Sequence, residues 1–332
     1  MVAKKILQND VFVRVVLFFV IYFTFAFIQP IVLTPVNIVS MINDSIYNGV
    51  AALGMMVIMV TGNFDLSSTS IAMSAALITI QLYTLLGYAG DFFTMFLIAS
   101  IVGAALAMVN GFLSQAFNLS GFVVSIGTNL IFSSVYFIFI RPTIKTIDLP
   151  QNILLVRTMH IISIRSDDGP DANMNIGIIV LVGTAMMLWF LMNKTQLGRG
   201  IYALGGDPIA LERVGYSPMM IKLLAYAVFG FCSGIAGIYF FSNSGQFEPN
   251  LIVAKGADVI ASAIFGGCNM REGKGSLGGI MAGVAVITVI RSNLILVGVP
   301  PYFVTFAVGM IILLGVLFST LSERRLQKSF GR

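Results

Sequence analysis

The segment GGCNMREGKGS, which begins at Gly266, is the first candidate for chemistry, because glycines followed by a lysine can bind phosphate. A phosphate-binding loop places four residues between its first glycine and a Gly-Lys-Ser or Gly-Lys-Thr sequence, directly after a strand. Here five residues separate Gly267 from Gly273, Gly275 follows Lys274, and no strand pattern precedes the segment. We therefore predict that this chain does not hydrolyse ATP itself.

Catalytic and metal-binding clusters are not predicted either. The only histidine, His160, lies in a polar loop, and the two cysteines, Cys232 and Cys268, lie in or beside apolar runs. A catalytic triad or a metal site needs several such side chains within reach of one another. We therefore expect no enzyme activity, no metal ion and no cofactor, with both cysteines acting as small buried hydrophobic residues and His160 solvated.

Three ionisable residues, Asp65, Asp258 and Arg291, lie in or beside apolar stretches. A charged side chain at the centre of a bilayer costs about 2.5–3.5 kcal/mol on insertion scales, so each needs a local reason. Asp65 comes directly before Leu66 and Ser67 at the start of an apolar run, which suits a helix cap. Lining of a polar substrate path is the alternative for Asp65, and the same two hypotheses apply to Asp258. Arg291 is expected to extend to the membrane interface or to pair with an acid.

The elements that position these residues follow from the composition. Hydrophobic residues make up 58% of the 332 residues, charged residues 10%, and the mean hydropathy is +0.95. Soluble domains carry about 25% charged residues, so lipid is the solvent that fits this chain. Runs such as 15–27 and 178–192 are apolar on all sides, which favours helices over the alternating pattern of a β-barrel. We predict an all-α polytopic integral membrane protein with about ten transmembrane helices, some short or re-entrant.

Apolar runs separated by glycine, proline, asparagine and charged residues give the candidate spans. They are 14–33, 45–62, 66–86, 92–114, 119–140, 174–192, 219–241, 257–268, 277–297 and 302–320. The run at 257–268 is too short to cross alone unless it is extended, tilted or re-entrant. The first run is longer than the apolar part of a signal peptide and lacks a cleavage site, so we predict a retained span. Residues 1–332 are expected to form one transmembrane domain.

Lysine and arginine predict the orientation. With ten spans, both termini, the loop 193–218 and the connection after the eighth span lie on one side, and all four carry cations. That side is cytoplasmic by the positive-inside rule, and the long loop 141–173 is then external. The net charge of +5 therefore does not indicate nucleic-acid binding.

The loop 193–218 contains the signals of a short helix. Asp207 is a good N-cap, Pro208 suits the first helical position, and Gly215 suits the position after the last turn. Such a helix, over about 208–214, has roughly two turns and is too short to be stable alone in water. Two hypotheses follow from the spacing: a surface loop with a helical turn, or a helix presented to the groove of a soluble partner.

Three ordered segments resemble the permease subunits of ribose-type sugar ABC importers. Residues 198–238, GRGIYALGGDPIALERVGYSPMMIKLLAYAVFGFCSGIAGI, are similar to the cytoplasmic signature of that family. TGNFDLSSTS (61–70) is similar to its G-G-I-D-L-S-V-G-S block, and ADVIASAIFGGCNMREGKGS (257–276) to its last glycine-rich block. The hydrophobic layout between the segments agrees with this resemblance.

The resemblance implies a permease that works with several partners in a bacterial inner membrane. These are ATP-binding cassette ATPase subunits, a second permease copy or paralogue, an extracytoplasmic substrate-binding protein, and membrane lipid. It also implies that the short helix after the sixth span engages the ATPase. The coupling residues carried over are Gly205, Gly206, Asp207, Ala210, Glu212, Arg213 and Gly215. Glycines at 205 and 206 would allow a sharp turn or a close backbone approach.

Departures from the family pattern bear on the cargo. Asn63 and Phe64 replace a glycine and an isoleucine of the first block, and Cys268 and Asn269 replace small residues of the last. The predicted substrate path is lined by Asn63, Asp65, Ser67, Asp258 and Asn269. We predict import of a sugar or related polar small molecule by alternating access. The alternatives are a non-sugar cargo such as a nucleoside, vitamin or signalling furanose, and a stand-alone secondary transporter or channel.

Overall fold

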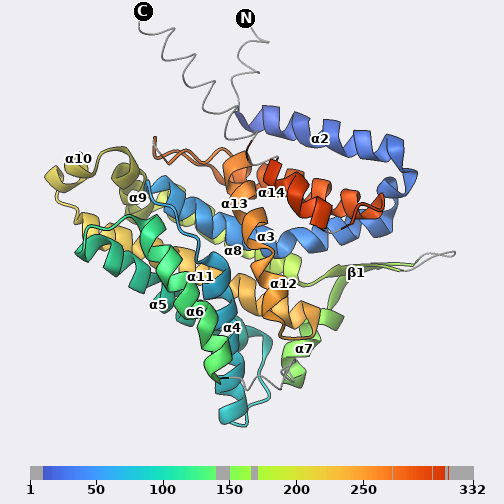
Figure 1. Ribbon diagram of the computed structural model, residues 1–332, viewed down its shortest axis with the longest axis horizontal. Helices are drawn as coiled ribbons and strands as arrows, with labels where there is room; N and C mark the ends of the chain where they lie inside the picture. Colours follow the sequence, from blue (N-terminus) through green and yellow to red (C-terminus); the bar gives the residue numbers. More distant parts are fainter. Residues whose placement is uncertain are drawn as a thin grey trace, which may run out of the picture.

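In the computed structural model, the described residues are 10–139, 150–165, 171–270, 272–300, 302–310 and 313. They are mostly helical, and the elements pack side by side as Figure 1 shows. The long helices are α2 (Asp10–Ile28), α3 (Pro35–Val60), α4 (Ser68–Leu85), α5 (Phe92–Ala116), α6 (Gly121–Phe139), α8 (Gly177–Lys194), α11 (Pro218–Ser244) and α14 (Leu277–Leu296). The short elements are η1 (Pro30–Leu33), α7 (Gln151–Thr158), β1 (His160–Ile164), β2 (Ala172–Asn175), α9 (Gln196–Gly206), α10 (Pro208–Arg213), α12 (Pro249–Val253) and α13 (Gly256–Phe265).

Helix α3 is the centre of the molecule. Every residue from Ile46 to Val60 is buried, which is the behaviour of a helix that is surrounded on all sides. Helices α8, α11, α13 and α14 pack around it. Thr34 accepts from the backbone N–H of Asn37, so α3 starts about ten residues before the predicted span.

Glycines allow a close helix contact between α5 and α11. A Cβ atom on Gly103 would lie 2.3 Å from the carbonyl oxygen of Gly230, and one on Gly234 would lie 2.0 Å from that of Ala99. Only glycine lets two helix backbones approach this closely. Gly230, Gly234 and Gly237 of α11 all serve helix packing in this way.

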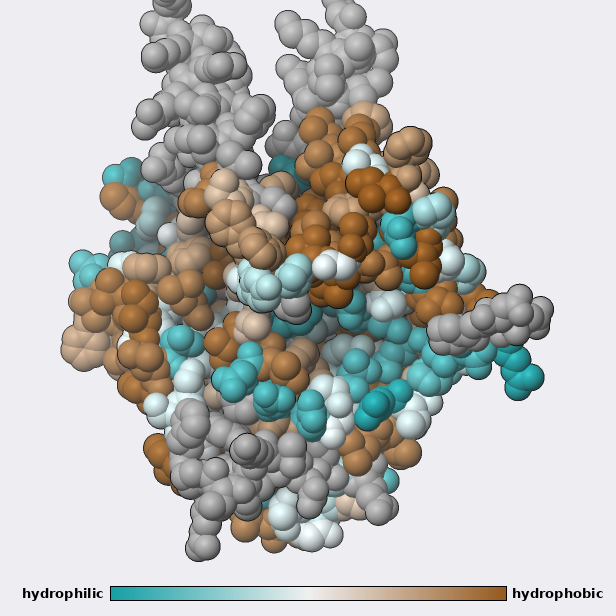
Figure 2. All heavy atoms as spheres, turned by 45° about the vertical axis from the view of Figure 1, so that its right-hand side comes forward, coloured by the Kyte–Doolittle hydropathy of each residue, from teal (hydrophilic) through white to brown (hydrophobic). Residues whose placement is uncertain are grey.

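The outer helices present apolar side chains to the surroundings. Among the described residues, seven helices are long and apolar enough to cross a membrane, and α2 is the most exposed of them, with only 11% of its stretch Val11–Ile28 buried. Figure 2 shows broad hydrophobic surface over the described residues, with hydrophilic residues gathered near the arm formed by β1 and β2. Exposed apolar helices of this length confirm the polytopic helical membrane protein. In the predicted tenth span, 302–310 is helical and most of the remainder lies outside the described residues.

The predicted loop 141–173 contains a short β-hairpin that the helix prediction missed. Strands β1 and β2 pair antiparallel, with His160 opposite Asn175. The Asn175 backbone N–H donates to Asn43 Oδ1 on α3, and its side chain donates to Val156 O. Segments of five and four residues are too short for a clear strand pattern, and contacts made far along the chain hold the hairpin in place. His160 is exposed, as expected.

The short predicted span at 257–268 is one part of a broken helix. Helix α12 ends at Val253, and α13 begins at Gly256, with Ala254 and Lys255 between them. The break therefore spans two residues, and the Lys255 backbone N–H still donates to Ile252 O across it.

Candidate functional site

The segment 193–218 folds as two helices, α9 and α10, where sequence analysis predicted one. Helix α9 begins after Thr195, whose hydroxyl accepts from the Gly198 N–H at 3.2 Å. Four glycines within eleven residues hid this helix from the sequence pattern, although Thr195 is an N-cap signal. Gly205 and Gly206 are its last residues, and the sharp turn comes at Asp207 instead.

Helix α10 confirms the predicted caps. Asp207 Oδ1 accepts from the backbone N–H groups of Ile209 and Ala210, at 2.9 and 3.0 Å. Pro208 holds the first helical position, and Gly215 follows the helix with φ +87°. These two ends fix a helix of six residues that its own hydrogen bonds could not stabilise.

The packing of α10 leaves most of it accessible. Leu211 is 2% exposed and anchors the helix, whereas Ile209 and Val214 are 64% and 71% exposed. Glu212 and Arg213 are also exposed. Helix α10 and its C-cap Val214 together combine one anchor with two exposed apolar residues and two charges, which makes a compact surface for a protein partner.

Helix α9 docks on α3 through Gly205. A Cβ atom on Gly205 would lie 1.8 Å from the carbonyl oxygen of Val60, the last residue of α3. It would also lie 3.0 Å from Gly273 Cα. The predicted close backbone approach is therefore found at Gly205, whereas a Cβ on Gly206 would meet nothing within 4 Å.

The turn 266–275, between α13 and α14, is the third part of this junction. Asn269 and Lys274 exchange backbone hydrogen bonds of 2.8 and 3.1 Å, which close the turn. The Tyr202 hydroxyl on α9 donates to Gly275 O at 3.0 Å. Asn269 therefore lies in the junction, and Tyr202 is a residue of this region that sequence analysis missed.

Asp65 lies fully buried in the connection between α3 and α4. Its Oδ1 accepts from the Ser67 N–H at 2.6 Å and from the Ser67 hydroxyl at 2.5 Å, and its Oδ2 accepts from Asn110 Nδ2 at 3.0 Å. The helix begins at Ser68 with Ser67 as N-cap, so the prediction that Asp65 is the cap residue is wrong by two positions. Asp65 holds the cap residue instead. Asn110, on α5, carried no sequence signal for this role.

Asp258 pairs with Arg291 across α13 and α14. Arg291 Nη2 donates to Asp258 Oδ1, and Arg291 Nε lies against Asp258 Oδ2, both at 2.8 Å. The Asp258 side chain is fully buried, and that of Arg291 is 17% exposed. Of the two alternatives expected for Arg291, pairing with an acid is the one that the structure has. The same ion pair explains why a carboxylate at Asp258 is tolerated within an apolar part of the chain.

The five predicted path residues therefore fall into three groups. Asp65 and Ser67 share one hydrogen-bond network, and Asn63 lies in the same connection, where its amide donates to Thr61 O at 3.2 Å. Asp258 belongs to the ion pair and Asn269 to the turn 266–275.

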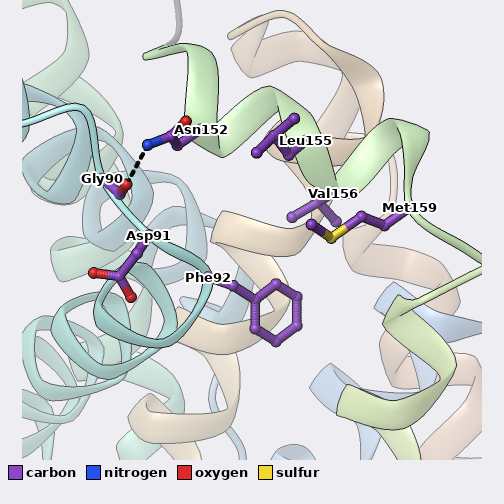
Figure 3. Close-up of a pocket in the computed structure, with 7 residues that line it drawn as sticks. All are labelled: Gly90, Asp91, Phe92, Asn152, Leu155, Val156 and Met159. Carbon is purple, nitrogen blue, oxygen red and sulfur yellow. Dashed lines mark hydrogen bonds between the residues drawn. The ribbon is translucent and has the colours of Figure 1, made fainter.

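A cavity of about 190 Å³ lies at the other end of the described helices. Figure 3 shows its lining from the start of α5 and from α7, with Asn152 Nδ2 donating to Gly90 O at 2.7 Å. The residues that line it are Gly90, Asp91, Phe92, Asn152, Leu155, Val156 and Met159. Asp91 caps α5 by accepting from the N–H groups of Phe93 and Thr94, and it also accepts from the Tyr88 hydroxyl. That Tyr88 hydrogen bond, together with those from Thr94 and Phe93, lowers the pKa of Asp91 to about 2.

Apolar helices around a buried α3, with a short capped helix held at the end of α9, define a polytopic helical membrane protein. The chain belongs to the family described as branched-chain amino acid transport system / permease component, whose model matches residues 37–315. The members of this class are transporter components rather than enzymes.

Individual relatives agree over most of the chain. The ribose import permease protein RbsC of Escherichia coli (strain K12) is 25% identical over 295 residues, 87% of each chain. The galactose/methyl galactoside import permease protein MglC of Salmonella typhimurium is 27% identical over 312 residues, 90% of each chain. RbsC of Bacillus subtilis is 26% identical over 301 residues, 90% of this chain and 89% of its own. No solved structure matches the chain.

Proposed function

We propose that this chain is the membrane-spanning subunit of an ATP-driven importer for a sugar or a related polar small molecule. The family membership and the ribose and galactose permeases among its relatives support this function. The whole chain, 1–332, acts as one permease domain. It forms no covalent bonds with its cargo and supplies a gated path that alternates between outward-facing and inward-facing states.

Helix α10 is the observation that carries the proposal. It is capped at both ends, anchored by Leu211 and otherwise exposed, so it presents a rigid binding surface to a partner. In the proposed complex, each of two ATPase subunits binds one such helix, and ATP binding moves it. The residues that take part are Gly205, Gly206, Asp207, Ala210, Glu212, Arg213 and Gly215.

The proposed arrangement places the chain in a bacterial inner membrane with both termini and α10 in the cytoplasm. The loop 141–173 then faces outward, toward an extracytoplasmic substrate-binding protein that delivers the cargo. A second copy of the chain or a paralogue completes the path. The proposed path residues are Asn63, Asp65, Ser67, Asp258 and Asn269.

Reconstitution with the ATPase and binding-protein partners tests the coupling role. Glu212→Lys reverses an exposed charge on α10, and Gly215→Pro removes a residue that needs φ +87°. Both variants should fold and insert but separate ATP hydrolysis from uptake. Glu212→Gln keeps the size of the side chain and removes only its charge. Its uptake per ATP hydrolysed should lie between that of these two variants and that of the wild type. Unchanged uptake and unchanged ATPase stimulation in Glu212→Lys and Gly215→Pro would refute the proposal.

A further inference from the structure

The turn 266–275 touches the proposed coupling segment with its backbone. A Cβ atom on Gly273 would lie 2.8 Å from the carbonyl carbon of Gly205 and 3.0 Å from the Gly206 nitrogen. Gly273 itself has φ +60°, so both its conformation and its contacts require glycine. The Tyr202 hydroxyl adds a hydrogen bond to Gly275 O at 3.0 Å. Since no long side chain intervenes, α9 cannot advance toward the turn without displacing it.

Behind the turn, α13 and α14 form one stiff hairpin. A Cβ atom on Gly283 would lie 2.2 Å from the Ser262 carbonyl oxygen, and one on Gly279 would lie 2.3 Å from that of Gly266. The hairpin is thus in backbone contact near its turn. Farther along, the Asp258–Arg291 pair ties the same two helices with two contacts of 2.8 Å.

The hairpin also has a natural hinge. Helix α13 is separated from α12 by Ala254 and Lys255, one turn beyond Asp258. Asp258 lies eight residues from Gly266, which is about 12 Å along a helix. In Figure 1 the turn that follows α13 extends toward α9 and α10, and both α13 and α14 pack against α3. A push at the turn would therefore reach the level of Asp258 before any break in the helix.

We propose that the α13–α14 hairpin is the element that receives the movement of α9 and α10. Tyr202 and Gly273 are positioning residues at the contact, and the break at Ala254 and Lys255 is the hinge. This inference rests on the proposed importer function and names the part of the permease that its coupling helix drives. The Asp258–Arg291 pair belongs to this hairpin. A movement of α9 and α10 would therefore also move this buried ion pair.

Cys268 provides a native reporter within the turn. It is one of two cysteines, and the other, Cys232, is completely buried on α11. Burial raises the pKa of the Cys268 thiol to about 12, with the Arg14 guanidinium opposing this rise. Because the thiolate is the reactive form, labelling of Cys268 by a maleimide at neutral pH is expected to be slow in the packed turn. The labelling rate therefore reports any opening of the turn.

The experiment uses the complete complex in lipid vesicles and measures maleimide labelling of the Cys268 peptide by mass spectrometry. We expect the labelling rates of the nucleotide-free and the vanadate-trapped ATP states to differ by about fivefold or more. Tyr202→Phe removes one hydrogen bond and should reduce this difference and lower the cargo transported per ATP by about fivefold. Tyr216→Phe, in the same cytoplasmic segment, is the matched control and should behave as the wild type.

The outcomes separate this inference from the function on which it rests. Equal Cys268 labelling in both nucleotide states, with Glu212→Lys still uncoupling the complex, would overturn the hairpin relay and leave the importer function intact. A Tyr202→Phe complex with the wild-type labelling difference and transport ratio would overturn the role of Tyr202. Failure of Glu212→Lys to uncouple would instead contradict the proposed function itself.

Discussion

Arg291 on α14 contacts both carboxylate oxygens of Asp258 on α13, each at 2.8 Å, within a chain whose other buried residues are mostly apolar. A two-point contact of this kind fixes the relative orientation of the two helices as well as their separation. The pair also removes the need for either charge to reach water. This one interaction therefore explains how both ionisable residues can lie in apolar stretches of the chain.

Breaking this pair should destabilise the protein strongly. Removal of one partner leaves a buried charge uncompensated, which costs about 3–5 kcal/mol for fully buried pairs and less here because Arg291 is partly exposed. We expect Arg291→Gln to lower the midpoint of thermal unfolding in detergent. The double variant Asp258→Leu with Arg291→Met should recover much of that loss, because it removes both charges together. A double variant as unstable as Arg291→Gln would contradict this account.

The same double variant addresses the path hypothesis for Asp258. If Asp258 acts only through the ion pair, the stable double variant should transport cargo at near the wild-type rate. Loss of uptake at wild-type stability would support a direct role of Asp258 in the path. Both quantities are measured on one reconstituted preparation, so stability and transport can be compared directly.

The cap of α10 should control coupling at a small cost in global stability. Asp207→Ala removes two hydrogen bonds at the helix start, and loss of an N-cap costs about 1 kcal/mol. Since α10 lies at the periphery, its local order should fall while the unfolding temperature changes little. We expect lower ATPase stimulation by loaded binding protein in Asp207→Ala. Asp207→Asn retains a capping side chain and should keep most of the stimulation; equal behaviour of the two variants would exclude capping as the cause.

Adding one methyl group between α5 and α11 should be costly. A Cβ on Gly230 would lie 2.1 Å from Gly103 O and 2.5 Å from Ala107 Cβ, so Gly230→Ala must separate the helices. Overpacking of this kind costs about 1–3 kcal/mol. The control is Gly183→Ala on α8, where an added Cβ meets nothing within 4 Å. We expect a lower unfolding midpoint for Gly230→Ala only, measured by thermal denaturation of both purified variants.

The α5 cap at Asp91 predicts a specific dependence on acid. Hydrogen bonds to the Asp91 carboxylate, of which the one from Tyr88 has the largest effect, lower its pKa to about 2. In the unfolded chain the pKa of an aspartate is about 3.9. A carboxylate whose folded pKa is lowered stabilises the fold above the unfolded pKa and loses that contribution as pH falls through the folded pKa. The difference in unfolding midpoint between wild type and Asp91→Leu should therefore be constant from pH 7 to about pH 5 and shrink between about pH 4 and pH 2. A difference that does not change with pH would contradict the ionised cap.

The sequence by itself determined the features that depend on neighbours along the chain. Apolar runs specify membrane helices because each residue's transfer free energy is local. The ends of α10 were predictable because Asp207, Pro208 and Gly215 act within one turn of their own positions. The boundaries of α3 and the presence of α9 were missed, since polar and glycine residues at those positions are compensated by packing elsewhere.

Only the tertiary structure decided which distant residues meet. Arg291 is 33 positions from Asp258, Asn110 is 45 from Asp65, and Tyr202 is 73 from Gly275. Each of these contacts satisfies a polar group that the apolar interior cannot solvate, and many polar residues along the chain could have done so. The glycine contacts of Gly205 depend in the same way on how two backbones cross. A spacing rule within one helix carries no information about that crossing, because it is set by the packing of all the helices around α3.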